Sequence, residues 1–397
     1  MVYYDKWVEI DTDAIKFNLL QVRSQVPEQV RLIAVLKAQA YGHGATEVAR
    51  ILYQNGVDFF AVSYLPEAMQ LRNGGIRASI LLFTPLIDYY QIKEAVENHI
   101  TMTITSLYDA RLLEEVAGGI SQPVTVHLKI ETGLGRFGLN AGEAAEICQK
   151  LSSCSNIYIE GIYTHMAEGG AANSRYTRRQ FKRFQRVVQK LEEEGYNIPV
   201  KHVANSAVFL KYPDMHLNAV RIGTLLSGQH PVGNIKNPLK LVDPYTFKTH
   251  VIAIKDHKAG DYLGYSRTWR LTRDAQVAVI PAGYHDGLAL EVANQPTGWL
   301  DLFKRMVKML LAYLNIRRFQ LTVRIKGKSY PIRGKVFMQM ALIEIPRGVE
   351  VNIGDEVELP VRKTLVADST VRLYKKSGRA GKQGDIYHTS YLAGEEQ

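Results

Sequence analysis

A regular alternation of short apolar runs and longer amphipathic stretches constrains this chain more than any other feature. Stretches such as RYTRRQFKRFQRVVQKLEEEG place their apolar residues on one face of a helix. Strand-length apolar runs between helices are typical of βα units around a parallel sheet. Eight runs predict an α/β fold with a (β/α)8 barrel of the TIM type, and they lie at 31–36, 59–63, 79–83, 102–104, 124–130, 158–164, 201–204 and 219–222.

The pattern becomes β-rich after about residue 235. Strand-like segments here include KTHVIAIKD, AQVAVIPAG and QLTVRIKG. Turn residues separate them, and few stretches have helical spacing. We therefore expect a barrel over residues 10–235 and a mostly β domain over 236–397. DLFKRMVKMLLAYLNIRR interrupts the β pattern with helical spacing, which predicts an inserted amphipathic helix at about 298–318. A packed helix with a charged outer face is favoured over a helix on a membrane surface.

Composition excludes several classes of protein. A length of 397 residues with 46% hydrophobic side chains suffices for two cores, and no apolar run is long enough to span a membrane. The first residues lack the basic and apolar regions of a secretory leader, so a cytoplasmic protein is expected. Two cysteines support neither a disulfide framework nor a metal site. The net charge of +10 favours anionic ligands in general, but no nucleic-acid-binding motif accompanies it.

Chemically distinctive residues follow the predicted barrel strands, where the reactive groups of such barrels lie. Lys37 follows the first run; alone it could extend its amine to solvent, or it could be a desolvated nucleophile. The residues that follow the later predicted strands also have purely structural explanations. Ser206 could cap a helix, His165 could be a core histidine and Gly223 could form a turn. Together with Arg221, these residues suit an anionic cofactor that carries an aldehyde.

Eight ordered segments carry a resemblance to a known family. AVLKAQAYGHGA resembles the pyridoxal-lysine motif of alanine racemases, and HLKIETGLGRFGL resembles their arginine-bearing fifth-strand motif. THMAEGG, HVANSA and VRIGTLLSG resemble the later barrel motifs, and LGYSRTW, PAGYHDGL and GKVFMQM resemble those of the second domain. The similarity is collinear over about residues 5–290 and 322–360. It implies a fold-type III pyridoxal 5'-phosphate enzyme, with residues 1–9 in the β domain and a head-to-tail homodimer that shares its active sites.

The resemblance assigns the cofactor contacts residue by residue. Lys37 matches the lysine that bonds the cofactor covalently, and Arg221 matches the residue facing the pyridine nitrogen, with His165 behind it. Near the C-terminus, where the match is poor, Tyr374 is the candidate for a further phosphate contact. The residues that match the family's contacts to the phosphate and its surroundings are Tyr41, Asn205, Ser206, Gly223 and Thr224.

The resemblance also assigns the substrate side. Arg136 matches the arginine near the cofactor phenolate and the substrate carboxylate, and Lys129 matches a lysine that is carbamylated in many members and orients that arginine. The partner subunit supplies the residues that match Tyr265, the second catalytic base, and Met338, whose backbone helps to hold the carboxylate. Tyr284 belongs to a motif that lines the substrate channel.

These residue types suit racemisation, which needs a proton donor and acceptor on each face of Cα. Lys37 serves one face and Tyr265 the other, with His165 and Arg221 supplying positive charge near the tyrosine. Because Arg221 only donates hydrogen bonds, the pyridine nitrogen must accept, which weakens the cofactor as an electron sink. Amino-acid decarboxylation, the rival reaction on this fold, prefers a carboxylate there. The sequence therefore predicts interconversion of L- and D-alanine.

Several positions on the substrate side depart from the family pattern. Phe337 replaces a small residue, Gln339 an aspartate and Lys335 an arginine, while Leu290 stands where arginine is frequent. If Phe337 points inward it narrows the pocket and favours a small substrate; if it points outward, that inference lapses. Racemisation of serine or another amino acid stays an alternative. So does a regulatory pyridoxal-phosphate-binding protein without turnover, although such a protein has no need of both Lys37 and Tyr265.

Overall fold

The chain divides into two compact units, which are described separately. One contains Asp11–Pro244; the other contains Tyr245–Lys375 together with the N-terminal segment through Ile10. The computed structural model describes residues 4–171, 174–232, 239–291, 294–296, 298–314, 316, 319–378 and 391–392. Parts of the predicted β domain and of the predicted inserted helix, at 1–3, 236–238, 292–293, 297, 315, 317–318, 379–390 and 393–397, lie outside these residues.

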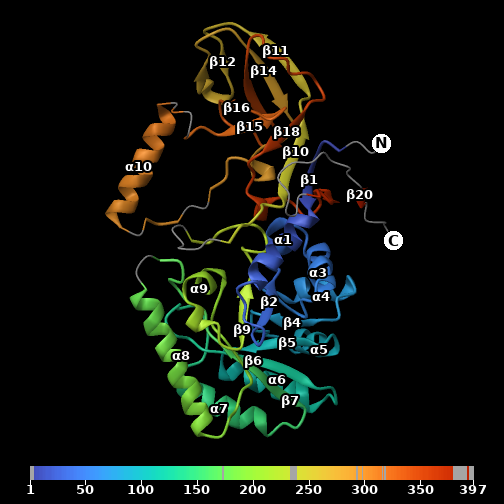
Figure 1. Cartoon of the computed structure of the whole chain (residues 1–397), viewed down its shortest axis with the longest axis vertical. Coiled ribbons are helices and arrows are strands. Elements are labelled where there is room, and N and C mark those ends of the chain that lie inside the picture. The colour runs from blue at the N-terminus through green and yellow to red at the C-terminus, as the bar shows by residue number, and fades with distance from the viewer. Residues whose placement is uncertain are drawn as a thin grey trace. The chain divides into compact units, whose positions relative to one another are not determined.

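A closed parallel sheet forms the centre of the first unit (Figure 1). Closure between its end strands comes from the N–H groups of Asn218 and Arg221, which donate to the carbonyls of Lys201 and Ala204 at 3.1 and 2.8 Å. The predicted barrel is confirmed. Its eight strands are β2 (Arg31–Val35), β3 (Phe59–Val62), β4 (Ser79–Leu82), β5 (Ile100–Ile104), β6 (Val124–Lys129), β7 (Ile157–Tyr163), β8 (Val200–His202) and β9 (Ala219–Ile222).

Helices alternate with these strands along the chain, as the amphipathic stretches predict. Local capping fixes several of their starts, since the Asp11 carboxylate accepts the N–H groups of Asp13 and Ala14. The helices are α1 (Thr12–Arg23), α2 (Lys37–Gly42), α3 (Ala45–Gln54), α4 (Leu65–Asn73), α5 (Tyr89–Glu97), α6 (Leu107–Gly118), α7 (Ala141–Ser152), α8 (Arg175–Glu193), α9 (Ser206–Lys211) and the 3-10 helix η1 (Pro213–Met215).

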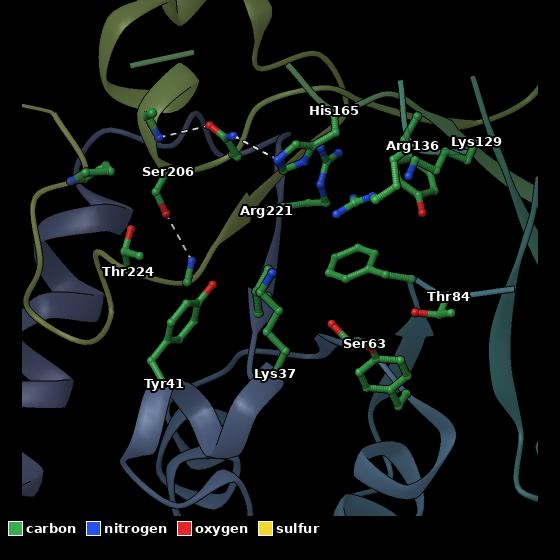
Figure 2. A pocket seen from close by; sticks show the side chains of 18 of the residues that line it. Lys37, Tyr41, Ser63, Thr84, Lys129, Arg136, His165, Ser206, Arg221 and Thr224 are labelled. Carbon is green, nitrogen blue, oxygen red and sulfur yellow. Dashed lines mark hydrogen bonds between the residues drawn. The ribbon is translucent and has the colours of Figure 1, made fainter. Parts of the chain in front are cut away.

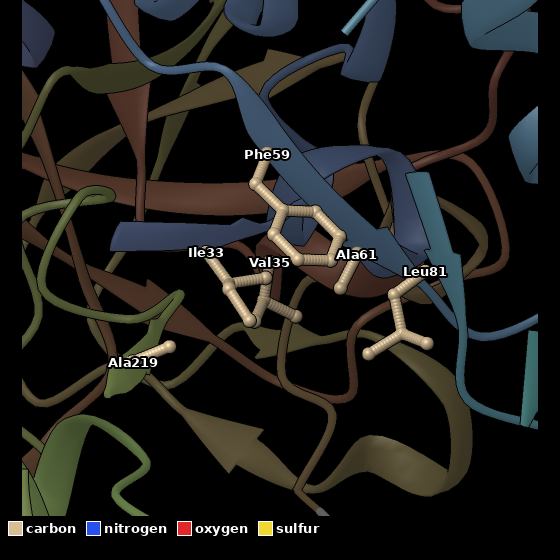
Figure 3. Packing of buried hydrophobic residues seen from close by; sticks show 6 residues of the cluster. All are labelled: Ile33, Val35, Phe59, Ala61, Leu81 and Ala219. Carbon is tan, nitrogen blue, oxygen red and sulfur yellow. The ribbon is translucent and has the colours of Figure 1, made fainter. Parts of the chain in front are cut away.

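Apolar side chains from neighbouring strands pack together in the barrel (Figure 3). Burying each large aliphatic or aromatic side chain contributes roughly 1.5–3 kcal/mol. This packing makes the barrel a rigid support for the groups at the carboxyl ends of its strands. The cluster in Figure 3 consists of Ile33, Val35, Phe59, Ala61, Leu81 and Ala219.

The second unit is built on a sheet with the order β11-β14-β17-β16-β15-β18-β10-β1-β19-β20. Its N-terminal strand, β1, pairs antiparallel with β10, and a small β12–β13 hairpin lies outside this sheet. The strands are β1 (Lys6–Asp11), β10 (Tyr245–His250), β11 (Ala253–His257), β12 (Tyr262–Leu263), β13 (Trp269–Arg270), β14 (Ala275–Ile280), β15 (Thr322–Ile325), β16 (Lys328–Arg333), β17 (Ala341–Pro346), β18 (Glu356–Leu359), β19 (Arg372–Lys375) and β20 (Tyr391–Leu392).

The second unit also contains α10 (Trp299–Tyr313), which falls within the predicted insertion. None of its residues is buried, and Figure 1 shows it apart from the strands of its unit. The expectation of a packed helix is therefore wrong for the single chain, because nothing in the described part of it buries any residue of α10. No helix in the described ranges is long and apolar enough to cross a bilayer.

Candidate active site

Lys37 begins an unusual turn directly after β2. The next four residues, Ala38–Tyr41, have φ between 50° and 59°, so α2 winds in the left-handed sense. This conformation costs L-residues roughly 1–2 kcal/mol each. Side chains from α4 help to hold it, since Glu67 accepts the Ala38 N–H at 2.6 Å and the amides of Gln39 and Gln70 bond each other at 2.9 and 3.2 Å. The turn places Lys37 and Tyr41 together at the barrel mouth (Figure 2).

A pocket of about 480 Å³ opens at the carboxyl ends of the barrel strands. It brings together every site residue that the sequence predicts in the first unit: Lys37, Tyr41, Lys129, Arg136, His165, Asn205, Ser206, Arg221, Gly223 and Thr224. Figure 2 shows Lys37 and Tyr41 reaching into the pocket from one side, with Arg136, His165 and Arg221 facing them. The pocket thus combines a lysine amine, two guanidinium groups and several hydroxyl groups.

One corner of the pocket consists of hydroxyl groups and a glycine. The Gly223 N–H donates to the Ser206 hydroxyl at 3.2 Å, and a Cβ at position 223 would lie only 2.2 Å from the Tyr41 hydroxyl oxygen. Burial raises the pKa of Tyr41 to about 12, so its hydroxyl keeps its proton and can donate. The buried Thr224 hydroxyl has no hydrogen-bond partner among the described residues. These features suit a small oxyanion at this corner.

The amine of Lys37 lies in a partly buried and positively charged setting. Burial, with the nearby Arg136 charge, lowers its pKa, while Glu67 opposes the shift. A lowered pKa increases the fraction of neutral, nucleophilic amine at neutral pH. The structure therefore favours the desolvated nucleophile over a lysine that merely extends to solvent.

Lys129 ends β6 beneath the loop that carries Arg136. Its Nζ lies 3.5 Å from the centroid of the Phe137 ring, and burial together with the charges of Arg136 and Arg221 lowers its pKa to about 7. The Glu131 carboxylate shapes the loop by accepting the N–H groups of Leu134 at 2.7 Å and Arg136 at 3.4 Å. A substantial fraction of Lys129 is therefore neutral near pH 7.

Arg221 is buried, and four of its five N–H donors have acceptors. Nη1 donates to His202 Nδ1 at 2.7 Å and to the His202 carbonyl at 2.9 Å. Nη2 donates to the carbonyls of Thr164 at 2.7 Å and Val203 at 3.2 Å. The remaining donor, Nε–H, has no acceptor among the described residues, and Arg221 lines the pocket. One directional donor is thus left for a ligand.

His165 differs from its predicted electrostatic role. Burial, followed by the charges of Arg221 and Arg136, lowers its pKa to about 3, so its imidazole is neutral at neutral pH. The prediction that His165 supplies positive charge is therefore wrong, and the two arginines carry that charge instead. The Asn205 amide lies 3.5 Å from His165 Nε2, while its oxygen caps α9; Asn205, and not Ser206, is the cap.

Three predicted residues of the second unit lie close to one another. The N–H of Tyr284 donates to the Phe337 carbonyl, and that of His285 donates to the Met338 carbonyl, both at 3.0 Å. The Tyr265 ring meets the Phe337 ring edge-on at 5.0 Å, and Tyr265, Tyr284 and Met338 are all exposed in the single chain. Tyr374, the remaining candidate, lies on β19 of this unit.

The sequence reasoning missed several residues of the pocket. Ser63 directly follows β3, and Thr84 lies two residues after the end of β4, as Lys37 does after β2; both line the pocket. The same rule could have found them. Tyr163 also lines the pocket and stacks on His202 at 4.8 Å between ring centroids, a contact that no local sequence signal reveals.

Comparison with known proteins gives matches over both units. Residues 10–231 match the family "Alanine racemase, N-terminal domain", and residues 245–377 match "Alanine racemase, C-terminal domain". Alanine racemase 1 of Oceanobacillus iheyensis is 33% identical over 346 residues, which cover 86% of this chain and 85% of that protein. The alanine racemase of Methanococcus maripaludis is 34% identical over 359 residues, with 90% and 89% coverage.

Solved structures give the same result. An alanine racemase from Clostridium difficile 630 superposes with a TM-score of 0.82 at 28% identity, covering 95% of this chain and 97% of that one. The Bacillus anthracis alanine racemase with bound L-Ala-P gives a TM-score of 0.79 at 27% identity, with 98% of each chain covered. Since both halves of the chain match one family in one order, this protein belongs to the alanine racemase family.

Proposed function

We propose that this chain is a pyridoxal-phosphate enzyme that interconverts L- and D-alanine, acting as a homodimer with shared active sites. One observation supports this most directly: the same pocket is lined by the Lys37 amine, with its lowered pKa, and by Arg221, whose Nε–H no described residue accepts. An amine suited to bond an aldehyde and a donor suited to a ring nitrogen are the two groups that this cofactor requires. The family of the chain agrees with this reading.

The first unit's pocket fits the cofactor. Tyr41, Ser206 and Thr224 offer hydroxyl groups to a phosphate, and Gly223 leaves the space that a side chain would fill. The unpartnered Thr224 hydroxyl is accounted for if a ligand oxygen bonds it. Lys37 would hold the aldehyde carbon, and Arg221 would face the ring nitrogen.

Arg221 favours racemisation over other reactions of amino acids. Although burial lowers its pKa to about 10, the guanidinium stays protonated at neutral pH and can only donate. A ring nitrogen held opposite it would therefore have to accept a hydrogen bond and would stay unprotonated. When bound, pyridoxal phosphate withdraws electron density from Cα of the amino acid, and an unprotonated ring does so only moderately. This limits the side reactions that a stronger electron sink promotes.

Two residues move the proton at Cα. Lys37 Nζ removes or returns it on one face, and the hydroxyl of Tyr265 of the partner subunit does so on the other. Arg136, with the backbone of Met338 of the partner subunit, binds the substrate carboxylate. The exposure of Tyr265 and Met338 in the single chain is compatible with both completing a second subunit's site.

Alanine is the substrate that the second unit favours. The Phe337 ring packs against the edge of Tyr265, so it lies beside the proposed second base. In a shared site a bulky ring beside the second base would restrict the space available to a substrate side chain, which favours alanine. Serine, which adds one hydroxyl group to alanine, is the nearest alternative.

The proposal is tested by following Cα–H exchange of L-alanine in D2O together with chiral chromatography of the products. Wild-type protein should incorporate deuterium and form D-alanine. Tyr265→Phe should lower racemisation by about 100-fold or more, as expected for loss of a general acid–base group. Lys37→Ala should also abolish the visible absorbance of the bound cofactor, because the covalent bond to the aldehyde is lost.

A screen of the twenty common amino acids provides the control for substrate identity. Exchange with serine but not alanine would refute alanine as the substrate while leaving the chemistry intact. Absence of exchange with every amino acid, with cofactor still bound, would instead favour a regulatory binding protein. A visible band that survives in Lys37→Ala would assign the cofactor to another lysine.

A further inference from the structure

A continuous line of hydrogen bonds leads from Arg221 down the inside of the barrel. Arg221 Nη1 bonds His202 Nδ1 at 2.7 Å, and His202 Nε2 bonds His127 Nδ1 at 2.9 Å. His127 Nε2 then bonds the Glu160 carboxylate at 3.0 Å, which in turn pairs with Arg31 at 3.4 Å. The line therefore joins the pocket to the partly exposed Glu160 near the start of the barrel strands.

Donor and acceptor chemistry gives this line one direction. Arg221 has no acceptor atom, so His202 Nδ1 must accept and the proton of His202 must be on Nε2. His127 Nδ1 accepts that proton's hydrogen bond, so His127 carries its own proton on Nε2 and donates it to Glu160. Each donor in this line meets an acceptor only if both imidazoles are neutral and in the Nε2–H tautomer. Burial, the largest cause, lowers the pKa of both histidines and agrees with neutral rings.

The backbone of β7 leaves space for the His127 ring. Any Cβ at Gly161 would lie 2.4 Å from Nδ1 of the His127 ring, so only glycine leaves room for it. The pairing of β6 with β7 shifts register at the same place: Val126 pairs with Ile159, but His127 pairs with Gly161. Glu160 is thus the additional residue of a bulge, a device that redirects a side chain.

The line also connects two charges. Arg221 is a buried cation, and no carboxylate contacts it within the described ranges. A buried charge without compensation is unfavourable. Glu160 provides negative charge that reaches Arg221 through the two polarised imidazoles. The pKa of Glu160 is lowered: burial opposes this shift, but the hydrogen bond from His127 and the Arg31 charge outweigh burial.

We propose that His127 and Glu160 are positioning residues that hold His202 in its Nε2–H tautomer and thereby aim the Arg221 Nε–H into the pocket. The inference deepens the proposed function and rests on it, because Arg221 is the residue assigned to the cofactor's ring nitrogen. If His202 carried its proton on Nδ1, that proton would face the Arg221 Nη1–H groups, and the guanidinium would have to turn.

Long-range proton–nitrogen NMR of 15N-histidine-labelled holoenzyme reports the tautomer of His202 directly. Wild-type protein should show a protonated Nε2 and a bare Nδ1. His127→Leu removes the acceptor, so a second tautomer should appear and the affinity for pyridoxal phosphate should fall about tenfold or more. His127→Asn, whose amide oxygen can replace Nδ1 as the acceptor, should restore both signals. Glu160→Leu and Glu160→Gln form a second pair with the same expectations.

Thr103→Val is the matched control. It removes the hydrogen bond between Thr103 and the Tyr163 hydroxyl in the same barrel interior but leaves the line from Arg221 to Glu160 intact. Its His202 signals and cofactor affinity should match the wild type. The proposal is overturned if both leucine variants leave the tautomer and affinity unchanged, or if the control changes them equally. Wild-type protein without racemase activity would refute the proposed function alone, since the tautomer is read without substrate.

Discussion

Lys129 shows how strongly a position at the end of a barrel strand can alter the pKa of a side chain. An ordinary lysine is almost fully protonated at pH 7, but burial and the neighbouring arginine charges lower the pKa of Lys129 to about 7. Only a neutral amine reacts with CO2, giving a carbamate and releasing one proton. The carbamate would be an anion near Arg136 and Arg221, the two cations that help to lower the pKa of the amine.

We expect Lys129 to take up CO2 at a fixed concentration of the dissolved gas. Occupancy should rise as the pH increases through about 7 and be lost below it, because protonation removes the reactive form. Carbon-13 NMR of protein equilibrated with 13C-labelled CO2 measures this. Lys129→Met should lose the signal, whereas the surface variant Lys150→Met should retain it; a signal that persists in Lys129→Met would contradict the assignment.

At the scale of elements, the barrel was predictable because each strand is a separate apolar run. The site residues followed, since a barrel places the ends of its strands on one rim. The pairing of His127 with His202 was not predictable, because 75 residues separate them and each lies in a run that reads as buried strand. The bulge at Glu160 was equally hidden, since its sequence shows no break in the strand pattern.

The helix α10 provides a prediction about stability. Phe303 is 58% exposed whereas Phe247 on β10 is 1% exposed. Phe303→Ser should therefore change the free energy of unfolding by less than about 0.5 kcal/mol, and Phe247→Ala should cost about 3–5 kcal/mol. Denaturant unfolding of the two variants measures both. A large loss for Phe303→Ser that shrinks on dilution would mean that a second copy of the chain covers α10.

At the scale of the whole molecule, the proposed homodimer predicts complementation between two inactive variants. In a shared site, Lys37 comes from one subunit and Tyr265 from the other. Unfolding and refolding an equal mixture of Lys37→Ala and Tyr265→Phe should recover about a quarter of the wild-type activity, since half of the dimers are mixed and each has one intact site. No recovery, with mixed dimers demonstrated by mass spectrometry, would place both residues of a site in one chain.

The reversed turn after β2 restricts which residues evolution can place there. KAQAYG consists mostly of good helix formers, so propensity predicts a helix but gives the wrong hand. Valine or isoleucine at Ala38 or Ala40 would crowd its branched carbon against the main chain at these positive φ angles. Mutational drift at this stretch should therefore be confined to compact or unbranched side chains, even at Ala38, whose side chain faces solvent.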